Sequence, residues 1–107
     1  MPASPPHLFV DISSHGFGHL AQVAPILNEL IRLRPSLRLT VRSALPTENL
    51  HIRLNGDFTH IPHRSDFGFV MRDAVRIDLA ATASAYRMQH DNWPQRVSKE
   101  AEFLSGL

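Results

Sequence analysis

The order of apolar and polar residues predicts a strand, a loop and a helix near the start of the chain. Residues 7–13 form an apolar run of strand length. Glycine and histidine residues then interrupt the pattern. Across residues 19–33 apolar side chains recur at helical spacing, namely Leu20, Val23, Ala24, Leu27, Leu30 and Ile31. Pro25 falls inside this predicted helix, so we expect an irregular or kinked first turn.

A second strand, a short helix and a third strand are predicted next. Pro35 ends the first helix, and residues 37–42 alternate apolar and polar side chains with period two. Residues 46–56 carry a helix start signal before Gly56, and residues 57–61 predict a third, weaker strand. Strands joined through a helix in this way are parallel and cross over with a right hand. The sequence therefore predicts an α/β fold with a Rossmann-like parallel sheet.

The C-terminal part of the chain has a helical pattern from Asp73 almost to its end. One face is formed by residues three or four apart, namely Leu79, Ala83, Tyr86, His90, Trp93, Val97, Ala101 and Leu104. This stripe stays in phase through Pro94. We expect either one helix kinked at Pro94, or two nearly coaxial helices with Pro94 in the first turn of the second. Tyr86 and Trp93 are expected to belong to the core.

The chain length limits the domain organisation. With 107 residues, of which 43% are hydrophobic, the chain suffices for one small domain. We expect residues 1–6 to form a flexible, proline-rich leader and residues 7–107 to form a partial Rossmann-like domain. In a doubly wound fold a further parallel strand would follow the last helix and lie beside the first strand. Without it the first strand keeps an open edge, through which we expect self-association.

Composition and charge narrow the class of partner and compartment. The net charge of +1 creates no bulk field that would attract nucleic acid or anionic lipid, so no nucleic-acid partner is expected. The chain has no cysteine, which excludes disulfides, thiolate metal sites and cysteine nucleophiles and suits a reducing compartment. No secretory signal is visible, and no stretch approaches the about 18 apolar residues of a membrane span. We therefore expect a cytoplasmic protein.

The candidate chemistry lies in the loop from Ser13 to His19, between the first strand and the first helix. Its glycines let the backbone approach a ligand, and N–H groups at a helix N-terminus attract anions. A tight turn alone would also explain the glycines, but His15 and His19 favour a chemical role. Their i, i+4 spacing would suit a metal, yet no third ligand is evident, so no metal is expected. A neutral histidine here can act as a general base, hydrogen-bond a phosphate, or merely cap the helix.

Several known glycine loops can be distinguished by spacing. The Walker A pattern is absent. Gly16, Gly18 and Ala21 match a dinucleotide fingerprint, and Arg42 stands where a contact to a 2′-phosphate would lie. An NADP-binding Rossmann domain is therefore one alternative, although the polar residues before Gly16 are atypical for it. A non-catalytic remnant that only binds a ligand or partner is another.

The run HGFGHLAQVAPILNELI after an apolar strand resembles the N-terminal segment of GT-B type glycosyltransferases. The shared pattern is a Gly-x-Gly-His loop and a helix with proline six residues after the histidine. The run is especially similar to a bacterial branch of predicted glycosyltransferases and to the N-terminal domain of L-arabinokinase-like proteins, which carry a HGFGH loop. The resemblance spans residues 7–107 and includes residues 78–82 and 92–97, which are similar to the long helix before the fourth strand.

This resemblance implies roles for individual residues. His19 would be the catalytic base that deprotonates a hydroxyl acceptor. Gly16, Phe17 and Gly18 would face the diphosphate of a nucleotide-sugar donor, with Ser14 and His15 as further substrate-binding residues. The family's main donor site lies in a C-terminal domain that these residues do not include, so the chain alone is expected to be inactive. No cofactor other than the donor is expected.

Overall fold

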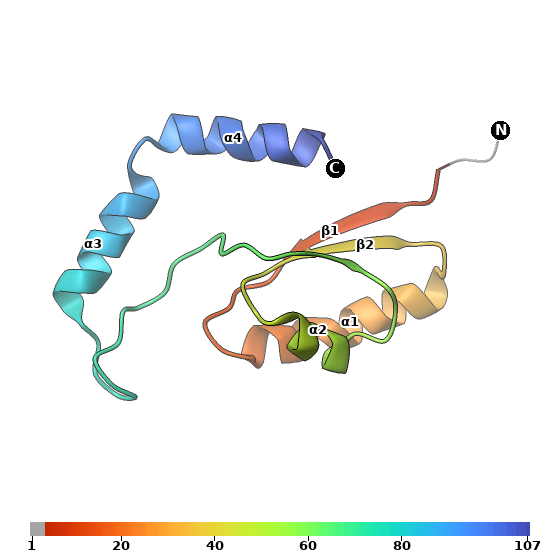
Figure 1. Ribbon diagram of the computed structural model, residues 1–107, viewed down its shortest axis with the longest axis horizontal. Coiled ribbons are helices and arrows are strands. Elements are labelled where there is room, and N and C mark those ends of the chain that lie inside the picture. The colour runs from red at the N-terminus through yellow and green to blue at the C-terminus, as the bar shows by residue number, and fades with distance from the viewer. Residues whose placement is uncertain (1–3) are drawn as a thin grey trace. The chain divides into compact units, whose positions relative to one another are not determined.

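The structure is a computed structural model that describes residues 4–107 (Figure 1). These residues form two compact units, one ending at Ser65 and the other running from Asp66 to Leu107. The first unit contains the sheet and two helices, and the second contains two further helices. The α/β class predicted from the sequence is confirmed.

The first unit is built from strands and helices that alternate along the chain. Its elements are β1 (His7–Asp11), α1 (Gly18–Leu33), β2 (Arg38–Arg42), α2 (Thr47–Arg53) and β3 (Thr59–Ile61). The strands are parallel in the order β1-β2-β3, so β1 is an edge strand. Every element begins and ends within a few residues of the range that the sequence predicted.

The hydrophobic core lies between the sheet and the two helices of this unit. It contains Ile12, Leu20, Ala24, Leu27, Leu39, Val41, Leu45, Leu50 and Leu54. The Asn28 side chain links α1 to the end of α2. Its Nδ2 donates to Arg53 O at 2.9 Å, and its Oδ1 accepts from Asn55 N at 2.9 Å. Figure 1 shows α1 and α2 together on one side of β1 and β2. This face explains why the apolar positions of α1 follow a helical spacing.

Two expectations concern the N-terminal part of the chain, namely an irregular first turn in the first helix and a flexible leader before the first strand. The irregular first turn of the first helix is not found, because the backbone is α-helical at every residue from Gly18 to Leu33. Pro25 has no N–H, so the carbonyl group one turn earlier in the helix loses its hydrogen-bond donor. Because Pro25 lies on the exposed face of the helix, water can donate to that carbonyl group instead. Of the expected leader, residues 1–3 lie outside the described part. Pro6 O accepts a hydrogen bond from Arg38 N at 2.8 Å and thus extends the pairing of the strands.

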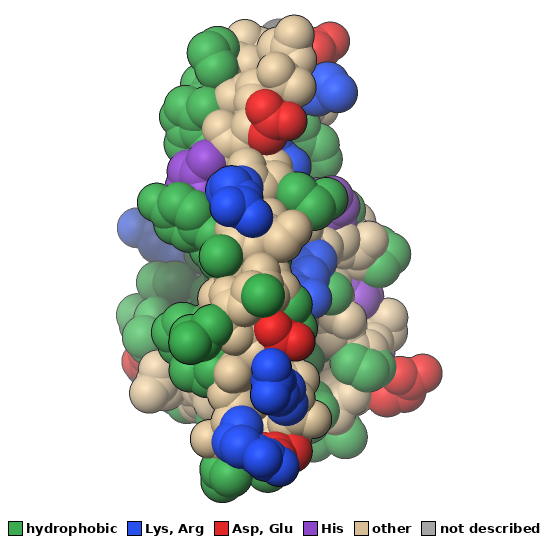
Figure 2. All heavy atoms as spheres, turned by 90° about the vertical axis from the view of Figure 1, so that its left-hand side faces the viewer, with side chains coloured by type: hydrophobic (Ala, Val, Ile, Leu, Met, Phe, Trp, Pro, Cys, Tyr) green, Lys and Arg blue, Asp and Glu red, His purple; other side chains and the backbone are tan. Residues whose placement is uncertain are grey.

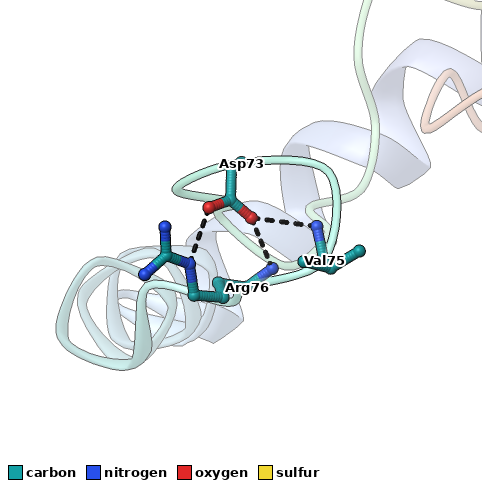
Figure 3. Close-up of polar contacts among 3 residues, drawn as sticks. All are labelled: Asp73, Val75 and Arg76. Atoms are coloured by element: carbon teal, nitrogen blue, oxygen red, sulfur yellow. Dashed lines mark hydrogen bonds and ion pairs between the residues drawn. The ribbon is translucent and has the colours of Figure 1, made fainter.

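The second unit begins with a turn where the sequence predicted helix. Asp73 Oδ1 accepts from Val75 N at 3.0 Å and from Arg76 N at 2.9 Å, while Arg76 Nε donates to Asp73 Oδ2 at 2.6 Å (Figure 3). These bonds fold residues 73–76 into a closed turn. Helix α3 (Leu79–His90) starts only afterwards, with the Asp78 side chain capping Ala81 N. The prediction of helix from Asp73 onward is therefore wrong, because its carboxylate binds the backbone locally.

Two helices rather than one kinked helix follow this turn. Helix α4 (Trp93–Ser105) begins with Pro94 in its first turn, as the second of the two alternatives predicted. Asn92 between the helices is left-handed, with φ of 52°. This residue turns the chain, and Figure 1 shows α3 and α4 meeting at a corner. The two helices are therefore not coaxial.

The predicted apolar stripe of the second unit is not a core. No residue from Asp66 to Leu107 is fully buried, and Tyr86 and Trp93 are 55% and 50% exposed. Their rings instead contact His90, at centroid distances of 4.2 and 5.3 Å. In the view of Figure 2, hydrophobic side chains lie on the surface beside charged ones. The expected place of Tyr86 and Trp93 in the core is therefore wrong.

The helices also bear on membrane insertion. Across the part of the chain that the structure describes, none of them combines the length and apolar character needed to traverse a bilayer.

Candidate functional site

The loop between β1 and α1 lies at the carboxyl end of the parallel strands. In α/β sheets this edge is where ligands bind. Ile12, which is buried, fixes the start of the loop, and its N–H continues the strand pairing by donating to Arg42 O at 2.9 Å. From His15 to His19 every residue is exposed. The loop is thus anchored at its base and open to solvent at its tip.

Glycine is required at one position of this loop for a structural reason. Gly16 has a φ of +154°, which side-chain-bearing residues rarely adopt. An added Cβ at Gly16 or Gly18 would meet no atom within 4 Å. The loop surface around both glycines is therefore open, and a ligand could reach the backbone there.

The N-terminus of α1 carries positive charge that no side chain offsets. Phe17 is the N-cap residue and makes no side-chain cap hydrogen bond, and the first turn contains no acidic residue. The unpaired N–H groups of a first helical turn represent about half a positive charge. The end of α1 that faces the loop is therefore favourable for an anion.

Four of the predicted site residues line one open pocket of about 260 Å³. They are His15, Gly16, Gly18 and His19. Ser14 is half-buried and Phe17 is 55% exposed, and neither lines this pocket. Ligand pockets for whole small molecules usually measure about 300–1,000 Å³. This pocket is therefore smaller than most sites that enclose a whole small-molecule ligand.

Gln22 also lines the pocket, although the sequence reasoning did not select it. It follows Gly18 by four residues and His19 by three, and such residues share one face of a helix. The spacing alone could therefore have identified it. Its amide supplies both hydrogen-bond donors and an acceptor to the pocket.

The two loop histidines are exposed. Within residues 4–107, the His19 ring makes no hydrogen bond, so no carboxylate of this part of the chain orients it. Among the described residues no group of three side chains is arranged to hold a metal ion. His19 is thus accessible to a substrate but is not preoriented by a neighbour within residues 4–107.

Arg42 is held beneath the loop by Asp11. Its Nε and Nη2 donate to Asp11 Oδ2 at 3.0 and 2.7 Å, and its side chain is only 7% exposed. The guanidinium also lies over the Phe9 ring, 5.2 Å from its centroid. This pair joins the carboxyl ends of β1 and β2, so the Arg42 side chain already has a partner within the sheet.

His60 has a structural role. Its Nδ1 is 2.8 Å from Thr47 Oγ1, and its Nε2 is 2.9 Å from Ser43 O. Because a carbonyl oxygen only accepts, Nε2 must carry a proton. The ring thereby fixes the start of α2 to the chain after β2.

Comparisons with known proteins add no relative. No family model, curated protein or solved structure matches the chain.

Proposed function

We propose that the chain is the acceptor-side, N-terminal part of a GT-B type glycosyltransferase. Such an enzyme moves a sugar from a nucleotide-sugar donor to a hydroxyl acceptor. The observation that carries the proposal is the open loop from Gly16 to His19 at the carboxyl edge of a parallel sheet. The strand order β1-β2-β3 supports it, because one half of a doubly wound sheet has this order. The lack of cysteine supports a cytoplasmic location.

His19 is the proposed general base. Its ring takes the proton of the acceptor hydroxyl while the oxygen attacks the anomeric carbon of the donor sugar. The bond from that carbon to the nucleoside diphosphate breaks, and the diphosphate leaves with the bonding electron pair. The exposed His19 ring suits this role because an acceptor can approach it. A carboxylate outside residues 4–107 would orient the ring.

The backbone of the loop would stabilise the leaving diphosphate. The N-terminus of α1, which no side chain caps, and the open surface at Gly16 and Gly18 provide N–H donors and a positive field. The pocket of about 260 Å³ is smaller than a usual site for a whole ligand, and it is open to solvent on its outer side. We therefore assign the nucleoside contacts to a second domain, without which the chain is inactive.

The open edge of β1 would receive the next parallel strand of such a domain. Within residues 4–107 the only strand beside β1 is β2. A sheet edge offers N–H and C=O groups to an added strand. Where that strand is missing, the same edge would pair with another copy, which is the self-association expected from the sequence.

Two observations bear on the two alternative functions, an NADP-binding domain and a domain that only binds a ligand or partner. An NADP site would need Arg42 to bind the 2′-phosphate, but Arg42 is buried and held by Asp11. A binding-only role is favoured by the absence of any side chain within residues 4–107 that orients His19. The pocket itself serves either role, so binding and turnover must be measured separately.

Calorimetry with the 107-residue chain tests the ligand class. Uridine diphosphate and inorganic diphosphate should bind weakly, and NADPH should bind no better than either. Binding of the diphosphates should be lost in Gly16→Val, which fills the loop and forbids its backbone conformation. The matched variant His19→Ala should keep it, because the base does not hold the diphosphate. Micromolar NADPH binding that disappears in Arg42→Glu would overturn the glycosyltransferase proposal.

A further inference from the structure

A second pocket opens at the amino ends of the three strands, at the edge of the sheet opposite the loop from Gly16 to His19. Its volume is about 540 Å³, which falls within the about 300–1,000 Å³ of sites that enclose a whole small molecule. Its walls come from the first residues of β1, β2 and β3, from α1 and from the segments that enter β2 and β3. The pocket lies wholly within the first unit and shares no residue with the pocket of the loop.

Arg38 and Asp57 bring opposite charges to the wall of this pocket. Arg38 is the first residue of β2, and Asp57 lies two residues before β3. They precede by two positions Thr40 and Thr59, which are partners in the sheet. Side chains two residues apart in an extended chain lie on the same face, so Arg38 and Asp57 belong to one side of the sheet. Within residues 4–107, however, neither charged side chain forms a hydrogen bond or an ion pair.

The apolar part of the pocket is already in place. Ile31 and Phe58 both line the pocket and pack against the hydrophobic core. The Phe58 ring also contacts the His51 ring, at a centroid distance of 4.8 Å. Leu37, which is half-buried, is a further apolar lining residue. A ligand would therefore meet a preformed apolar surface beside the two charges.

His7 and Thr40 add hydrogen-bonding groups to the pocket. His7 Nε2 lies 2.7 Å from Thr40 Oγ1, and Thr40 is only 6% exposed. This bond fixes the imidazole ring, whose Nδ1 makes no hydrogen bond in the part of the chain that the structure describes. That nitrogen can therefore donate to a ligand or accept from it.

We propose that this pocket binds a free α-amino acid with a large apolar side chain. The carboxylate of the amino acid accepts hydrogen bonds from the Arg38 guanidinium, and its ammonium group donates to the Asp57 carboxylate. Its side chain lies against Leu37 and Phe58. The inference does not depend on the glycosyltransferase proposal, because the two pockets have no residue in common.

The two charges select this class of ligand. A simple anion would be attracted by Arg38 and repelled by Asp57, and a simple cation would meet the reverse. A neutral apolar molecule would reduce the hydration of both charges without compensating either. A zwitterion compensates both charges, and an apolar side chain covers the remaining wall.

The exposure of the two charged residues limits the affinity. Arg38 and Asp57 are both exposed, and water weakens ion pairs at the surface of a protein. We therefore expect a dissociation constant in the millimolar range. Nuclear magnetic resonance measures binding of this strength directly.

Titration of the isotope-labelled full chain with L-phenylalanine tests the proposal. The amide signals of Arg38, Phe58 and Thr59 should shift with one dissociation constant. Two analogues serve as controls, since 2-phenylethylamine lacks the carboxylate and 3-phenylpropionate lacks the ammonium group. Each analogue should bind about fivefold more weakly, because it loses one charged contact and is repelled by the remaining like charge.

Two variants assign the charges individually. In Arg38→Gln, L-phenylalanine should lose its advantage over 2-phenylethylamine, and in Asp57→Asn it should lose its advantage over 3-phenylpropionate. Arg34→Gln is the matched control, because Arg34 is exposed but does not line the pocket, and its replacement should leave the affinity unchanged. Circular dichroism should show all three variants folded, since the replaced side chains are exposed.

Three results would overturn the proposal. Equal affinity for all three compounds would mean that the apolar wall alone binds the ring. Wild-type affinity for L-phenylalanine in Arg38→Gln or Asp57→Asn would mean that the charges do not hold the ligand. No shift of the three amide signals at the solubility limit of L-phenylalanine would mean that the pocket binds no amino acid of this kind.

Discussion

The ion pair between Arg42 and Asp11 allows the most detailed prediction, because it fixes the strands beneath the candidate site. The Arg42 side chain is 7% exposed and the Asp11 side chain is 32% exposed. Loss of Asp11 would remove the carboxylate that binds Nε and Nη2 of a buried guanidinium, whereas loss of Arg42 would leave a carboxylate that water can reach. Removing one partner of a fully buried pair costs about 3–5 kcal/mol. We therefore expect Asp11→Ala to cost about 3 kcal/mol, near the lower end of that range.

Arg42→Met, which keeps most of the volume of the side chain, should cost less, about 1–2 kcal/mol. The double variant should lose less stability than the two single losses together, because each single variant already loses the interaction between Arg42 and Asp11 and the double variant loses it only once. The assay is urea unfolding of the wild type, both single variants and the double variant, followed by circular dichroism. Additive losses within about 0.3 kcal/mol, or a larger loss for Arg42→Met, would refute the reasoning.

Three further predictions concern the turn, the loop and the base. The pKa of Asp73 lies below its usual range because Val75 N–H and then the Arg76 side chain bind the carboxylate (Figure 3). The turn should therefore be fully formed above the pKa that Asp73 has in the unfolded chain. It should loosen as the pH falls through the lower pKa that Asp73 has in the folded chain. Amide shifts of Val75 in a pH titration measure this, and an unchanged Val75 signal in Asp73→Asn would contradict it. Gly16→Ala should destabilise the chain by about 1–3 kcal/mol, whereas Gly18→Ala, in helical backbone, should be neutral or stabilising by urea unfolding. In an enzyme that joins these residues to a donor domain, His19→Ala should lower kcat by about 10² to 10⁴ at unchanged donor affinity, and equal turnover would exclude His19 as the base.

Much of the first unit could be predicted from the sequence because its signals are local. The apolar run of β1, the alternation of β2 and the helical spacing of α1 each reflect burial on one side of a single element. These elements do pack on one another, so the local patterns and the core agree. The loop before α1 was predicted for the same reason, since a glycine between a strand and a helix marks a special backbone conformation, found here at Gly16.

The structure of the second unit differs from the predicted one because of contacts and backbone conformations that the spacing of apolar residues does not reveal. Asp73 binds its own backbone and closes a turn in place of the expected helix. Asn92 adopts a left-handed conformation, so the two helices do not continue one another. The apolar stripe with Trp93 has the spacing of a buried face, yet burial depends on what packs against it, and within residues 4–107 it stays exposed.

The site was predicted only in part. His15, Gly16, Gly18 and His19 line the pocket as their neighbourhood in sequence suggests. Gln22 was missed because it lies in the helix rather than in the loop. The burial of Arg42 by Asp11 was missed too, because it depends on the register of β1 against β2. Contacts between distant segments are set by the folded chain and leave no mark on the spacing within either segment.

The central claim is that the loop from Gly16 to His19 binds the diphosphate of a nucleotide sugar. Its most direct test is nuclear magnetic resonance of the isotope-labelled chain during titration with uridine diphosphate. The account predicts that the amide signals of Gly16, Gly18 and His19 and the side-chain amide of Gln22 shift together with one dissociation constant. The signals of Thr59 and Phe58, at the opposite end of the strands, should stay unchanged. Shifts confined to that opposite end, or no shift in the loop at millimolar ligand, would contradict the account.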